Sequence, residues 1–207
     1  MIMERLVFIR MQPLRILLLE GAGEVLRPAL AEAYPMAEFL DARDVSQAGS
    51  VDLLVANLVL PWCAESVPTL AAWRHVLRPE GVVMVTLLGP DTLQEMRPFT
   101  TKSQLLDMHL LGDALVQAGF QTPVLDVEFL TLLYRDEKKC LQEMQEAGLL
   151  AEIPETVSWQ QDEEGRIPLS IEMVFAHAFC PVGSMLGVDG EVSVPLSKIL
   201  RRKAEIL

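Results

Sequence analysis

The stretch from Val51 to Arg97 constrains the fold of this chain most strongly. It opens with a continuous apolar run at Val51–Val55 and closes with a second one at Gly81–Leu88, and apolar residues at helical spacing lie between them. Apolar runs of strand length without polar alternation are typical of strands buried on both faces of a parallel sheet. The stretch therefore predicts strand, helix and strand, the repeating unit of an open α/β sheet.

The same alternation continues in both directions along the chain. Arg15–Glu20 is another apolar run, followed by a glycine turn, and predicts the first strand. The other expected strands are Ala37–Leu40, Val124–Tyr134 and Leu169–Phe179. Helices are expected over Glu24–Ala33, Lys102–Ala118, Asp136–Ala147 and Pro195–Leu207. One further helix is expected after Pro68, ended by Pro79 and Gly81. We expect one doubly wound α/β domain over residues 1–207, with the last two strands forming an antiparallel edge.

Charge and composition exclude several classes of protein. The net charge of −12 would repel a nucleic acid backbone, so a general DNA or RNA binder is disfavoured. The apolar runs are far shorter than the ~20 residues of a membrane-spanning helix, and the N-terminus shows no secretory signal, so we expect a cytoplasmic protein. Three widely spaced cysteines and three isolated histidines form no metal-binding pattern, and no metal site is expected.

The turn after the first strand, Glu20-Gly21-Ala22-Gly23-Glu24, is the first candidate for ligand binding. Ligands of open α/β sheets bind at the carboxyl ends of the strands, and glycines let the backbone pass close beneath them. Glu24 would oppose a pyrophosphate at the helix start, which argues against a dinucleotide, whereas carboxylates favour a cationic sulfonium cofactor. The alternative interpretation is a tight turn in which Glu24 serves only the helix dipole.

Five segments of this chain carry a specific resemblance. They are NLVLPW (Asn57–Trp62), RHVLRPEG (Arg74–Gly81), LGPDTLQEMR (Leu88–Arg97), DMHLLGDALVQAGF (Asp107–Phe120) and IEMVFAHAFCP (Ile171–Pro181). In this order they resemble motifs of the malonyl-carrier-protein O-methyltransferases of biotin synthesis, and of related complex I assembly factors with a methyltransferase fold. The resemblance covers most of residues 51–181.

The resemblance implies a Rossmann-like, class I methyltransferase with S-adenosylmethionine as its cofactor. It implies carboxyl O-methylation of malonyl-acyl-carrier protein, with the carrier protein as partner. The cofactor-binding residues would be Glu20, Gly21, Gly23, Asp41 and Asn57. Asn57 has the alternative role of capping a backbone turn. No catalytic residue is assigned. Arg97 is a candidate for holding a substrate carboxylate, and the alternative is that it is only an exposed arginine on a helix. His109 and Glu95 are the nearby acid/base candidates.

The cofactor half, residues 15–50, departs from the family pattern. The family's acidic position at the end of the first strand aligns with Leu19, and strand alternation would turn Glu20 to the other face. Only nine residues separate Asp41 from Val51, where a further βα unit would need about 25 residues or more. We therefore expect a sheet that lacks one βα unit and the family's N-terminal helices.

These departures leave three functional hypotheses. In the first, the chain is an active methyltransferase. In the second, it is an inactive homologue that acts as a partner or regulatory protein, for example with an intact methyltransferase or as a homodimer. In the third, it is a different enzyme on the same fold, such as a hydroxylase. The basic segment KILRRK at residues 198–203 is a candidate docking site for an acidic partner such as a carrier protein, or the cationic end of a helix.

Overall fold

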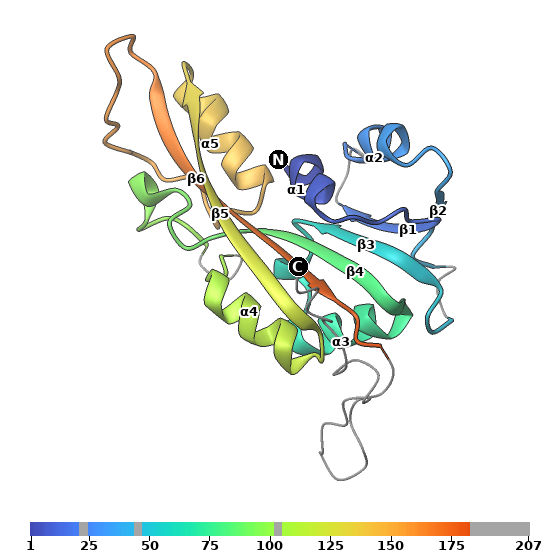
Figure 1. Ribbon diagram of the computed structural model, residues 1–207. Coiled ribbons are helices and arrows are strands. Elements are labelled where there is room, and N and C mark those ends of the chain that lie inside the picture. The colour runs from blue at the N-terminus through green and yellow to red at the C-terminus, as the bar shows by residue number, and fades with distance from the viewer. Residues whose placement is uncertain (21–24, 44–46, 102–104, 183–207) are drawn as a thin grey trace, which may run out of the picture.

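A computed structural model of the 207-residue chain describes residues 1–20, 25–43, 47–101 and 105–182 (Figure 1). The strands are β1 (Arg15–Glu20), β2 (Glu38–Leu40), β3 (Val51–Asn57), β4 (Leu77–Leu88), β5 (Gln121–Tyr134) and β6 (Ile167–Phe179). The helices are α1 (Ile2–Phe8), α2 (Arg27–Ala33), α3 (Ser66–Val76), α4 (Met108–Gln117) and α5 (Glu137–Glu146), with short 3-10 turns η1 (Leu60–Trp62) and η2 (Gln94–Met96).

All the strands belong to one sheet, in the order β2-β1-β3-β4-β6-β5. The first four pair in parallel, and β6 lies antiparallel between β4 and β5. The predicted α/β sheet and its antiparallel edge are therefore confirmed. Because β1, β3 and β4 run in parallel, their carboxyl ends meet at one edge of the sheet.

Two hydrophobic layers cover the sheet, one on each face. Leu17, Leu54 and Val83 pack with α3 and α4 on one face, whereas Ile16 and Leu53 pack with α1 and α2 on the other. Consecutive strand residues point to opposite faces, so covering both faces requires the continuous apolar runs seen in the sequence. Figure 1 shows the two pairs of helices on opposite sides of the sheet.

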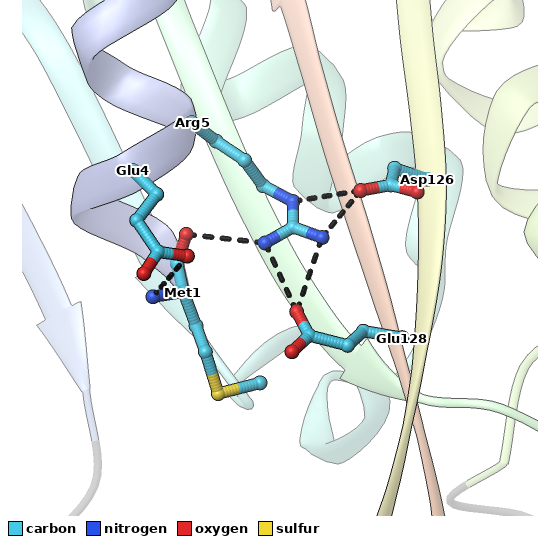
Figure 2. A network of polar contacts seen from close by, with 5 residues as sticks. All are labelled: Met1, Glu4, Arg5, Asp126 and Glu128. Carbon is cyan, nitrogen blue, oxygen red and sulfur yellow. Dashed lines mark hydrogen bonds and ion pairs between the residues drawn. The ribbon is translucent and has the colours of Figure 1, made fainter.

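One short helix, α1, precedes the first strand. Its Ile2 and Leu6 are buried against the sheet. Its Arg5 donates through Nε to Asp126 Oδ2 at 3.0 Å and through two nitrogens to Glu128 at 3.3 Å (Figure 2). The Arg5 guanidinium also lies over the Phe175 ring, 3.6 Å from its centroid, so α1 is attached to β5 and β6 by charge as well as by apolar contact.

Several helix boundaries differ from the predicted ones, most clearly those of α3 and α4. The helix after Pro68 was predicted to end at Pro79 and Gly81, but it begins at Ser66 and ends at Val76, because buried Leu77 already pairs with Val51. The helix predicted over Lys102–Ala118 starts at Met108 as α4. Residues 102–104 lie outside the described residues, and residues 105–107 are not helical. The segment before α4 lies along the end of β4, where the Leu106 amide donates to the Leu88 carbonyl.

No helix or strand lies in the described residues between β2 and β3, namely 41–43 and 47–50, as expected for a missing βα unit. The predicted C-terminal helix, residues 195–207, lies outside the described residues. Among the helices of the described ranges, none has the length and apolar content needed to cross a bilayer.

Candidate functional site

The ends of β1, β3 and β4 bring three polar side chains into register. Glu20 pairs with Asn57, and Asn57 pairs with Thr86, so the three lie side by side on the face of the sheet that α1 and α2 cover. The Thr86 hydroxyl donates to Asn57 Oδ1 at 2.7 Å and accepts from the Leu58 amide at 3.2 Å. The predicted position of Asn57 at the carboxyl edge is observed, and Thr86 is a neighbour that the sequence analysis missed.

Glu20 has an incompletely satisfied carboxylate. Its Oε2 accepts from the Leu26 amide at 3.3 Å, whereas its Oε1 is buried with no hydrogen-bond partner among the described residues. As strand alternation predicted, Leu19 packs on the opposite face, against the α3 and α4 layer. A buried carboxylate oxygen needs a donor, and a ligand bearing hydroxyl or amino groups fits this requirement. Gly21 and Gly23 lie outside the described residues.

Asp41 stands apart from this group. It follows β2, whose last residue Leu40 pairs with Leu17, so Asp41 leaves the sheet before the level of Glu20. Both of its carboxylate oxygens accept bonds from the Arg43 side chain, at 3.1 and 2.9 Å. Those bonds lower the pKa of Asp41 to about 2. A ribose hydroxyl that bound this carboxylate would therefore share it with Arg43.

A pocket of about 310 Å³ follows the carboxyl end of β4. Arg97 lies in its wall and donates through Nη2 to Asp91 Oδ1 at 2.6 Å. Both side chains remain at least half exposed, so a ligand can reach them. The full lining is Pro90, Asp91, Thr92, Arg97, Thr100 and Leu105.

Glu172 on β6 supports this pocket from beneath and was missed by the sequence analysis. Its side chain is 8% exposed, and its Oε2 accepts from the Asp91 amide at 2.7 Å. The signal was present, because Glu172 is the only acidic residue in the largely apolar run Ile167–Phe179 and carboxylates are seldom buried without a partner.

The two acid/base candidates do not meet in the pocket. His109 is exposed in the first turn of α4, and its backbone amide donates to the capping carboxylate of Asp107. Glu95 binds the amide and hydroxyl of Ser170 at 3.1 and 2.6 Å, which ties η2 to β6. Within the described residues, no group of three or more His, Cys, Asp or Glu side chains is arranged to hold a metal ion.

Several known proteins are similar in sequence to this chain, although no family model matches. Malonyl-[acyl-carrier protein] O-methyltransferases from Methylovorus sp. and Laribacter hongkongensis are both 34% identical, over 69% and 73% of this chain and 56% and 60% of their own length. The Coxiella burnetii protein of the same name, numbered 1, is 31% identical over 74% of this chain and 62% of its own length. The chain thus spans about three fifths of the curated relatives it matches.

Two solved structures share the fold. A protein of Bacillus halodurans assigned as a methyltransferase matches with a TM-score of 0.59 and 12% identity, over 88% of this chain and 99% of its own. The YcgJ protein of Bacillus subtilis matches with a TM-score of 0.54 and 9% identity, over 88% and 98%. The chain therefore has the Rossmann-like fold of class I methyltransferases and is related in sequence to the malonyl-[acyl-carrier protein] O-methyltransferases.

Proposed function

We propose that this chain is an S-adenosylmethionine-dependent O-methyltransferase that acts on the free carboxylate of a malonyl group carried by an acyl-carrier protein. The observation that carries the proposal is 34% identity over 167 residues to a protein named for this activity. The carboxyl-edge residues and the pocket after β4 support it, because donor and acceptor sites of an open α/β sheet are expected there.

The cofactor would be held at the ends of β1 and β3. Glu20, whose buried Oε1 has no partner among the described residues, would accept a hydrogen bond from the cofactor, and Asn57 lies beside it. Gly21 and Gly23, as glycines, would permit close approach of a ligand to the backbone, and cofactor binding by Asp41 would compete with its Arg43 ion pair. The cofactor supplies an electrophilic methyl group on a sulfonium, whose positive charge the Glu20 carboxylate favours.

The acceptor would be held by Arg97 in the pocket after β4. A malonyl carboxylate is already ionised at neutral pH, so the reaction needs no general base, and the exposed position of His109 is compatible with it. When bound, the cofactor would supply the methyl group to this carboxylate oxygen, and the electron pair of the carbon–sulfur bond would remain on sulfur. Arg97 positions the oxygen by bidentate bonding.

Calorimetric titration with S-adenosylmethionine and S-adenosylhomocysteine tests the cofactor site first. Micromolar binding is expected, and Glu20→Ala should weaken it by about tenfold because a charged hydrogen bond is lost. Glu32→Ala, which removes an exposed carboxylate from α2, is the matched control and should leave affinity unchanged. Absence of binding at millimolar ligand would contradict the proposal.

A second candidate is a homologue that has lost cofactor binding and acts through a partner. The observation that favours it is the Arg43 ion pair of Asp41, together with the lack of a βα unit in the described residues between β2 and β3. Undetectable cofactor binding, together with co-purification of an intact methyltransferase, is the result expected from this candidate.

Docking of an acidic carrier protein to this acidic chain requires local positive charge. Lys138 and Lys139 on α5 and the basic segment at residues 198–203 are the proposed contacts. Reversing the charges of Arg201, Arg202 and Lys203 should weaken carrier-protein binding, in a salt-dependent manner. Unchanged binding would remove that segment from the proposal.

A further inference from the structure

We infer that Glu172 is a positioning residue for the acceptor pocket, holding the loop after β4 so that Asp91 and Arg97 keep their places in its wall. The identity of the acceptor in this inference rests on the proposed function, whereas the contacts of Glu172 with the loop are observed independently of it.

Glu172 lies within β6, beside the point where β4 ends. The last residue pair between β4 and β6 is Leu88 with Met173, so Glu172 is the next residue of β6 beyond that pair. The Gly89 amide donates to the Glu172 carbonyl at 2.9 Å, which continues the pairing by one bond. The side chain of Glu172 therefore lies beneath the first residues of the loop.

Three further bonds attach the loop to Glu172. The Asp91 amide donates to the Glu172 carboxylate at 2.7 Å. The Thr92 hydroxyl donates to the Glu172 carbonyl at 3.2 Å and accepts from the Glu172 amide at 3.1 Å. Both Thr92 and Glu172 are buried, so water does not compete for these bonds.

Gly89 leaves the space that the carboxylate occupies. A Cβ at this position would lie 2.2 Å from Glu172 Cδ and 2.4 Å from Oε2. These distances are too short for any side chain, so the glycine and the glutamate depend on each other. Gly89→Ala should therefore displace the carboxylate without removing it.

The held residues are those that form the pocket. Asp91 and Thr92 line it directly, and the Asp91 carboxylate in turn binds Arg97. Fixing the Asp91 amide limits where its carboxylate can reach and therefore where Arg97 lies. The expected consequence is an effect on acceptor binding with little effect on the cofactor, whose proposed ligands are on β1 and β3.

The test uses the full chain and compares Glu172→Ala, Glu172→Gln and Gly89→Ala with a control variant, Glu163→Ala. The control removes an exposed carboxylate that does not line the pocket. For Glu172→Ala and Gly89→Ala we expect KM for malonyl-carrier protein to rise by about tenfold, with kcat within about threefold and cofactor affinity unchanged. Glu172→Gln keeps an acceptor for the Asp91 amide and should restore KM to within about threefold of the wild type. Glu163→Ala should behave like the wild type.

Amide hydrogen exchange provides a second measurement that does not depend on turnover. Exchange over residues 89–93 should accelerate by about tenfold in Glu172→Ala, because local opening becomes easier. Unchanged exchange there, unchanged KM, or a parallel loss of cofactor affinity would each overturn the inference. If the wild type transfers no methyl group, the proposed function fails, and exchange alone then decides whether Glu172 holds the loop.

Discussion

Glu20 and Asp41 are both carboxylates that follow strands, but their surroundings separate them. Glu20 keeps one buried oxygen without a partner among the described residues, whereas both oxygens of Asp41 are bound by the nearby Arg43. The sequence analysis named both as cofactor-binding residues on the strength of the family resemblance, and of the two it noted a departure from the family pattern only at Glu20. Their difference depends on side-chain positions that such patterns do not encode.

Removing Arg43 should release Asp41. The folded-state pKa of Asp41, about 2, lies below its ordinary value of 3.8, so Arg43→Ala should raise it toward 3.8. The pH at which this carboxylate protonates, measured by NMR titration, checks the shift. Arg10→Ala, a change to another exposed arginine, is the control. If Asp41 is a cofactor ligand, the Arg43 variant should also bind S-adenosylmethionine more tightly, and unchanged affinity would remove Asp41 from the site.

At the scale of single elements, α1 depends on Arg5 more than on its own helical propensity. A seven-residue helix is marginal by itself, and the Arg5 contacts with Asp126, Glu128 and Phe175 attach it to the sheet (Figure 2). Arg5→Ala should cost about 1 kcal/mol of stability, because the acidic partners are partly exposed and solvent screens them.

Arg5→Lys should not restore this stability, since a lysine lacks the planar guanidinium that bonds two carboxylates while stacking on a ring. Urea unfolding and amide exchange over residues 1–9 provide the measurements. Arg10→Ala is again the matched control, and equal losses from both variants would contradict an anchoring role for Arg5.

The end of β5 and helix α5 are joined by a bond that responds to alkaline pH. The Tyr134 hydroxyl donates to Glu143 at 2.7 Å. Burial and this carboxylate raise the pKa of Tyr134 to about 12. In the unfolded chain the phenol ionises near pH 10, so its contribution is fully present below pH 10 and is lost as pH rises toward 12.

Tyr134→Phe should therefore reduce the fall in stability between pH 9.5 and pH 11.5, as measured by urea unfolding. Tyr34, Cys140 and Cys180, whose pKa values are also raised by burial, remain in this variant and contribute to the residual pH dependence. Identical pH profiles for the variant and the wild type would show that the Tyr134 bond does not couple to folding.

Element boundaries show how far local sequence patterns carry. The apolar runs at Arg15–Glu20 and Val51–Val55 are long enough and uniform enough to identify β1 and β3 directly. The helix before β4 ends earlier than its proline and glycine indicated, because Leu77 gains a buried place beside Val51. The end of this helix thus depends on a tertiary contact between residues 26 positions apart in the sequence, which local helix and strand propensities do not predict.

At the scale of the whole molecule, we expect residues 1–207 to unfold as one domain. Trp73 packs in the α3 and α4 layer, whereas Trp159 packs in a separate cluster with α5 and the far ends of β5 and β6. Because β5 and β6 run continuously through both regions, their unfolding should be coupled. Urea unfolding of the Trp73→Phe and Trp159→Phe variants is followed by the fluorescence of the remaining tryptophans and by far-UV circular dichroism. The two signals should give the same midpoint, and separated midpoints would indicate two units.

The sequence by itself determined the α/β class, the positions of the buried strands and the relationship to methyltransferases. These properties depend on apolar periodicity and on motifs that are local in the chain. Only the tertiary structure decided that Glu20, Asn57 and Thr86 stand in one row, that Arg43 occupies Asp41, and that Glu172 supports the pocket of Arg97. Each of these depends on strand register or on contacts between distant segments, which are set when the whole chain buries its two apolar layers.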